Sequence, residues 1–131
     1  MALILTRAAG QAVYLGRHLN ADDLEGTYQV KIVVRDVPGD GWARNPRAIL
    51  DVYERVDGVV LRPVAVALNI HTPSISVPLS TMVELLRVAE DYLPGQLAPR
   101  CTAMLAIDSP RDVRILRDNA RVRQPKEALE A

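Results

Sequence analysis

A regular alternation of apolar and polar residues in the stretch "TYQVKIVVRDV", at 27–37, constrains the fold more than any other feature of the chain. Every second residue from Tyr28 to Val34 is apolar, and the residues between them include Gln29 and Lys31. Successive side chains of a β-strand point to opposite faces, so this period of two predicts a half-buried strand.

Four further apolar runs have the length of short strands. They lie at 3–7, 11–15, 101–107 and 112–117. Gly10 separates the first two runs, and glycine adopts the positive φ of a tight turn at little cost. Short strands of this kind, divided by glycine and proline, predict a mainly β chain.

The long middle segment, 38–100, contains two different signals. Asp57-Gly58 stands between two strand-like runs, and this dipeptide favours a two-residue β-hairpin. Thr81 and Glu84 have the spacing of a helix capping box, and apolar residues follow at helical spacing. The segment is therefore predicted to hold a β-hairpin and one α-helix. The apolar stripe of that helix would be Met82, Leu85, Leu86, Ala89 and Leu93.

The charges of the chain balance, with 16 basic and 16 acidic residues, so the net charge points to no partner. Their distribution is uneven, because five arginines and only two acidic residues lie between Arg111 and Arg123. Such a patch is compatible with phosphate contacts. A solvated face of a terminal strand and tail would give the same pattern, so composition alone leaves both interpretations open.

Other kinds of site find no support in the residue pattern. His18 and His71 lie far apart and Cys101 is the only thiol, so metal-ligand spacing is absent. The sequence contains no catalytic constellation, and we expect neither an enzyme nor a cofactor. The lone cysteine is typical of a reducing compartment, and no apolar run reaches the roughly 20 residues of a membrane helix. We therefore expect a cytoplasmic protein without a membrane partner.

Both ends of the chain resemble one family. The stretch "LILTRAAGQAVYLG", at 3–16, is similar to the N-terminal signature of the carbon storage regulator family (CsrA/RsmA). The stretch "LAIDSPRDVRILRD", at 105–118, resembles the closing signature of that family, and "YQVKIVVRDV" fits its middle strand. Together these segments cover about half of the chain, in the order of the family.

The resemblance implies a fold and an assembly. The expected core is a small five-stranded CsrA-like β structure, split between 1–37 and 101–118, which forms an intertwined homodimer. The residues at 38–100 would be an inserted hairpin-plus-helix segment, where the family has a tight turn. The residues at 119–131 would form an exposed C-terminal tail.

The resemblance also implies a function. Members of the family bind RNA with a GGA core, often in a hairpin loop, and repress translation or alter message stability. A post-transcriptional regulator with such RNA as its partner is therefore expected here. Carried over residue by residue, the RNA contacts would be Leu5, Thr6, Arg7, Ser109, Pro110, Arg111, Val113, Arg114, Ile115, Leu116 and Arg117.

Arg7 and Arg117 are the central residues of this expectation, because each ends an apolar run. Buried unpaired charge is costly, so both guanidinium groups should emerge at the rim of the sheet. If the first and last strands of opposite subunits neighbour each other, the two groups converge and can hold phosphate or the edge of guanine. A surface ion pair of Arg117 with Asp112 or Asp118 is the competing interpretation.

The inserted segment leaves a second function open. An insertion at a surface turn is tolerated because loop-closure entropy grows slowly with length. In this alternative the chain is a protein-interaction module on a CsrA-like scaffold. The residues at 38–100 would bind a protein partner, and RNA binding would be lost.

Overall fold

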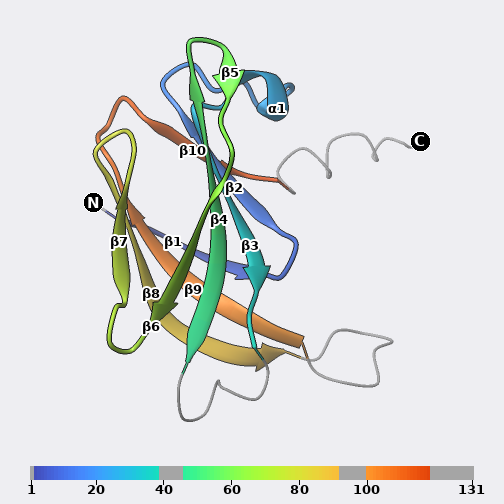
Figure 1. Cartoon of the computed structure of the whole chain (residues 1–131), viewed down its shortest axis with the longest axis vertical. Coiled ribbons are helices and arrows are strands. Elements are labelled where there is room, and N and C mark those ends of the chain that lie inside the picture. Colours follow the sequence, from blue (N-terminus) through green and yellow to red (C-terminus); the bar gives the residue numbers. More distant parts are fainter. Residues whose placement is uncertain (1, 39–45, 92–99, 119–131) are drawn as a thin grey trace, which may run out of the picture.

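The computed structural model describes residues 2–38, 46–91 and 100–118, and this part of the chain is almost entirely β-structure (Figure 1). The expectation of a mainly β fold is confirmed. The elements, in chain order, are β1 (Ala2–Ala8), β2 (Ala12–Gly16), α1 (Leu24–Thr27), β3 (Val30–Asp36), β4 (Arg47–Val56), β5 (Val59–Val60), β6 (Val64–Asn69), β7 (Ser74–Val77), β8 (Thr81–Asp91), β9 (Arg100–Asp108) and β10 (Arg114–Arg117).

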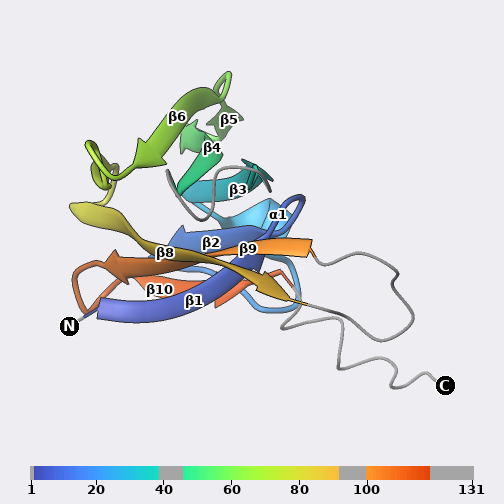
Figure 2. The same cartoon turned by 90° about the horizontal axis from the view of Figure 1, so that it is seen from below.

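The strands form two antiparallel sheets. The four-stranded sheet has the order β1-β9-β8-β7, and the six-stranded sheet has the order β10-β2-β3-β4-β5, with β6 also paired to β4. Figures 1 and 2 show β1 and β9 side by side, although they come from opposite ends of the chain. One core is built from both sheets; its fully buried members include Val13, Leu15, Val30, Ile32, Val34, Leu50, Leu68, Val83, Leu105 and Ile107.

The five strands expected from the two ends and the middle motif are present as β1, β2, β3, β9 and β10. The turn after β1 carries the chain from one sheet to the other, because β1 pairs with β9 and β2 pairs with β3. Gly10 adopts a φ of 89° there, as expected. Its N–H donates to the carbonyl of Val34 at 2.7 Å, which ties the corner to β3.

The helix predicted to start at Thr81 is wrong, because these residues form β8, which pairs with β7 and β9. The error has a physical origin in a β-bulge. Leu85 pairs with Leu105, but the next pair joins Arg87 to Met104, so Leu86 is an extra residue. The bulge resets the alternation and buries residues three apart, Leu85 and Val88, which mimics the spacing of a helix.

The predicted hairpin at Asp57-Gly58 is confirmed. Val56 pairs with Val59, and the two turn residues have φ angles of 51° and 78°. Positive φ at both central positions is the geometry that Asp-Gly favours. The middle segment contributes more than this hairpin, since its strands enter both sheets and its side chains Leu50 and Val83 are buried in the core.

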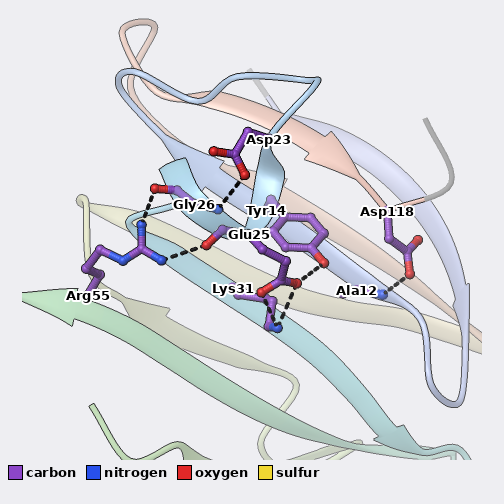
Figure 3. A network of polar contacts seen from close by, with 8 residues as sticks. All are labelled: Ala12, Tyr14, Asp23, Glu25, Gly26, Lys31, Arg55 and Asp118. Carbon is purple, nitrogen blue, oxygen red and sulfur yellow. Dashed lines mark hydrogen bonds and ion pairs between the residues drawn. The ribbon is translucent and has the colours of Figure 1, made fainter. Parts of the chain in front are cut away.

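The outer face of the six-stranded sheet carries a second, smaller cluster around Tyr14 and Tyr28. The loop containing α1 covers it, and Figure 3 shows Glu25 reaching both Tyr14 and Lys31. The Tyr14 hydroxyl donates to Glu25 at 2.6 Å, and the Lys31 ammonium lies 5.7 and 5.5 Å from the ring centroids of Tyr14 and Tyr28. Arg55 lies over the Tyr28 ring at 4.6 Å. Burial and then the hydrogen bond to Glu25 raise the pKa of Tyr14.

Helical structure is minimal in the described part of the chain. The helix α1 has four residues, and Asp23 caps it by accepting from the N–H of Gly26 at 3.1 Å. No helix in the ranges that the structure describes has the length and apolar character needed to cross a membrane.

Candidate nucleic-acid interface

The two termini of the β-structure meet where β1 and β10 end. The Nη1 atom of Arg7 donates to the Oδ1 atom of Asp118 at 2.7 Å. The other carboxylate oxygen of Asp118 accepts from the N–H of Ala12 at 3.0 Å, a contact visible in Figure 3. Asp118 therefore connects the end of β10 to both β1 and β2 within one chain.

Arg7 does not emerge at a rim, and that expectation is wrong. Its side chain is 3% exposed, and its Nε atom donates to the carbonyl of Thr6 at 2.8 Å. A guanidinium tolerates burial when a carboxylate and further hydrogen bonds compensate for lost water. Asp118 supplies the carboxylate, so the placement is physically consistent. No local sequence signal could have shown this pairing, because Asp118 lies 111 residues from Arg7.

The competing ion pairs for Arg117 are not formed. Asp118 contacts Arg7, and Asp112 accepts from the Nε atom of Arg17 at 2.7 Å. The hydrogen bond from Arg17 lowers the pKa of Asp112. The half-buried Arg117 side chain makes no hydrogen bond or ion pair with the described part of the chain.

The strand β10 has one open edge. It stands at the end of the six-stranded sheet, and among the described strands it pairs only with β2, from Arg114 opposite Gly16 to Arg117 opposite Val13. The strand β1 likewise stands at the end of its sheet. We call the place where these two edges meet, at Arg7 and Asp118, the β1/β10 seam; Figure 2 shows both strands on the same side of the molecule.

The side chains of the last strand alternate between the two clusters. Val113 and Ile115 pack against the main core, and Leu116 packs against the smaller cluster. Alternation puts Arg117 on the side of Ile115, at the end of the strand. Arg114 is exposed, and its Nη1 atom donates to the carbonyl of Leu19 at 2.7 Å. The arginines of β10 therefore lie on opposite faces of the strand.

The loop before β10 adds a third arginine. A turn closes it, because the N–H of Val113 donates to the carbonyl of Pro110 at 3.1 Å. Arg111 is exposed, while Ser109 and Pro110 are half-buried. These three residues precede β10 closely in the chain, and the buried Val113 separates them from the strand.

The first-strand residues divide between two environments. Leu5 is buried in the main core, with 9% exposure, so its side chain is not a surface contact. Thr6 is exposed on the opposite, outer face of the four-stranded sheet. Of the predicted contacts, the structure therefore groups Arg7 with the loop and β10, and sets Leu5 and Thr6 apart.

The chemical capacity of the β1/β10 seam is that of a polar strand edge. An open edge offers backbone N–H and C=O groups, which can pair with the edges of unstacked bases. Guanidinium groups add charged donors for phosphate or guanine. No group of three or more His, Cys, Asp or Glu residues that could hold a metal ion occurs among residues 2–38, 46–91 and 100–118.

Comparisons of the chain with protein-family models, with curated proteins and with solved structures found no match.

Proposed function

We propose that the chain binds single-stranded or hairpin-loop RNA with a GGA core and acts as a post-transcriptional regulator. In this proposal it belongs with the carbon storage regulator proteins and works as a homodimer in the cytoplasm. Occupancy of a message leader would block the ribosome or change the stability of the message. The terminal motifs support the proposal, because they provide β1, β10 and the loop that joins β9 to β10.

One observation carries the proposal. The open edge of β10 combines unpaired backbone groups with Arg111, Arg114 and Arg117. Single-stranded RNA is read through the edges of unstacked bases, and an exposed strand edge offers donors and acceptors at a matching position. Arg117 has no carboxylate partner in the described residues, and in this proposal its guanidinium contacts guanine or phosphate.

Arg7 takes a different role from the one that the sequence suggested. Its guanidinium is buried against Asp118, so we assign it to positioning rather than to RNA contact. The ion pair holds the end of β10 against β1 and β2. Through that contact Arg7 would fix the direction of the β10 edge that meets the RNA.

The test is a comparison of two hairpins at physiological salt. One carries GGA in its loop, and the other carries the same nucleotides in scrambled order. We expect the GGA hairpin to bind at least tenfold more tightly, because each base edge that is read contributes about 1–3 kcal/mol. Equal affinities of the two hairpins would contradict the proposal.

A second candidate function is favoured by the sheet edges that lie away from β1 and β10. The strands β6 and β7 end the two sheets there, and we call this place the β6/β7 seam. From Pro63 to Val83 the chain has no Asp, Glu, Lys or Arg. The side chains of Val64 and Ile70 are 63% and 55% exposed. Natural proteins protect edge strands with charge, so an uncharged apolar edge indicates a surface that another strand covers.

The occupant that this candidate specifies is a second copy of the chain. An antiparallel pair of β6 strands, one from each copy, would meet without like charges, because neither strand carries any. A hollow of about 200 Å³ between β6 and β7 would take apolar side chains. Its lining includes Val64, Val66, Ile75 and Val77, with Glu54 and Arg62 also present. The chain would then be a protein-interaction module built on the residues at 38–100.

A further inference from the structure

A polar hollow of about 130 Å³ lies on the outer face of the four-stranded sheet. Three neighbouring strands form it, since Thr6 of β1 pairs with Met104 of β9, which pairs with Arg87 of β8. The next row of its lining contains Thr102 and Ala89, which are also paired across the two strands. The hollow therefore joins the N-terminal motif to the middle segment.

The β-bulge in β8 is the reason why Arg87 faces this hollow. Val83 and Leu85 point into the core, so a regular strand would turn residue 87 inward as well. The extra residue, Leu86, reverses the alternation, and Arg87 becomes exposed while Val88 is buried. A bulge of this kind re-aims a side chain. Here it places a guanidinium on the same outer face as Thr6.

The lining of the hollow has the chemistry of an oxyanion site. Arg87 contributes a guanidinium, and Thr6 and Thr102 contribute hydroxyl groups, above a floor that includes Met104. No carboxylate occurs among the described residues that line the hollow. Arg87 itself has no hydrogen bond or ion pair with the described parts of the chain. Guanidinium groups bind phosphate oxygens through two parallel hydrogen bonds, and hydroxyl groups donate to the remaining oxygens.

The position of the hollow connects it with the proposed RNA surface. Thr6 immediately precedes Arg7, which contacts Asp118 at the end of β10. The strand β1 is the edge of its sheet, and β8 lies two strands further into the sheet. Adjacent strands are about 4.8 Å apart, so the backbone of Arg87 lies roughly 10 Å from that of β1. An RNA strand that leaves β10 across β1 would reach the hollow within a short distance.

We infer that Arg87, Thr6 and Thr102 bind a backbone phosphate of the RNA that the β1/β10 seam recognises. This inference rests on the proposed function and extends it, because the middle segment then supplies part of the RNA surface. The phosphate contact carries no base identity. Its contribution is affinity, whereas discrimination of GGA belongs to β10 and its loop.

The first arm of the test measures RNA affinity over a series of salt concentrations. Arg87→Gln is compared with Arg62→Gln, an exposed arginine of the same segment that lies away from the hollow. We expect Arg87→Gln to bind about tenfold more weakly, to GGA and scrambled hairpins alike, and to lower the salt slope by about 0.7. If RNA binds and the two variants bind it equally well, the inference is wrong, while the proposed function stands.

The second arm does not depend on the proposed function. Pyrophosphate is titrated into the wild-type protein while NMR follows the Met104 methyl group and the amides of Thr6 and Ala89. We expect saturable shifts that are lost in Arg87→Gln and kept in Arg62→Gln. Their absence in wild type, or their survival in Arg87→Gln, overturns the inference. Should the protein bind no RNA at all, the proposed function fails and the pyrophosphate result alone decides whether the anion site exists.

Discussion

The β1/β10 seam and the β6/β7 seam both contain open strand edges, but one is charged and the other is apolar. At the β1/β10 seam the edges of the sheets are joined by the ion pair of Arg7 and Asp118 and are flanked by arginines. At the β6/β7 seam the strands carry no charge, and Val64 of β6 and Ile70 of the loop that follows are exposed. Both leave edge groups that neighbouring strands do not satisfy. Charge suits one seam to nucleic acid, and its absence suits the other to a protein strand.

The largest effect is expected from removing the carboxylate at the charged seam. Asp118→Ala removes the carboxylate that accepts from the buried guanidinium of Arg7 and from the N–H of Ala12. We expect the free energy of unfolding to fall by about 2 kcal/mol, because two hydrogen bonds are lost and one of them joins charged groups. Urea titration measures it. The matched control is Asp112→Ala, since Asp112 pairs with Arg17 in an exposed setting and its loss should be barely measurable.

The contradicting result is a small loss from Asp118→Ala, equal to that from Asp112→Ala. It would mean that the ion pair of Arg7 and Asp118 contributes no more than the exposed pair of Arg17 and Asp112. The account of Arg7 as a positioning residue would then be lost.

The next effect in size concerns RNA binding at the same seam. Arg117→Ala should weaken binding of the GGA hairpin by tenfold or more, because a bidentate contact to guanine contributes about 1–3 kcal/mol. Stability should change by less than about 0.5 kcal/mol, since the Arg117 side chain makes no hydrogen bond or ion pair with the described residues. Fluorescence anisotropy and urea titration provide the two measurements. An unchanged affinity for the GGA hairpin would show that Arg117 does not contact the RNA.

A smaller effect is expected at the uncharged seam. Val64→Lys puts a charge on an exposed position of β6 and should leave the fold intact. If copies associate through β6, the dissociation constant of the dimer should rise about tenfold, because each copy would then bring a charged side chain into an apolar interface. Analytical ultracentrifugation measures it, with Thr72→Lys in the loop after β6 as the control. A dissociation constant that Val64→Lys leaves unchanged would show that the copies associate through another surface.

The smallest effect is expected in the tyrosine cluster of the outer face. Burial alone would raise the pKa of Glu25, but hydrogen bonds from Tyr14 and Lys31 outweigh burial and lower it. The resulting stabilisation is present above the ordinary carboxyl pKa and is lost as the pH falls through the lowered value. Glu25→Gln should therefore reduce stability at neutral pH by less than about 1 kcal/mol, because the carboxylate is largely exposed.

The check is thermal unfolding of wild type and Glu25→Gln between pH 7 and pH 3. The difference between the two proteins should shrink towards the acid end. A difference that grows as the pH falls would show that the sign assigned to Glu25 is wrong.

The sequence predicted those parts of the fold that depend on local pattern. The alternation at Tyr28 to Val34 is retained in β3, and Asp57-Gly58 forms its hairpin, because both signals act between near neighbours. The helix at Thr81 failed because one extra residue, Leu86, changed a period of two into the spacing of a helix. A bulge depends on pairing with the partner strand β9, so it cannot be read from the sequence of β8 alone.

In the candidate site, too, features set by local sequence could be predicted, and features that depend on contacts between distant residues could not. The loop and strand of the C-terminal motif could be placed because they are continuous in sequence. The burial of Arg7 could not, since its carboxylate partner is 111 residues away and the pair forms only when three strands converge. The hollow at Arg87 was missed for a similar reason, because Thr6, Met104 and Arg87 become neighbours only through strand pairing.

The comparison of the two seams is tested most directly by the backbone amides of their edge strands when RNA is added. NMR of the labelled protein with the GGA hairpin would follow the amides of β10 and of β6 in one experiment. We predict large shifts from Arg114 to Arg117 and none from Val64 to Asn69. Unchanged β10 amides, or shifts that concentrate in β6, would contradict the assignment of the charged edge to RNA.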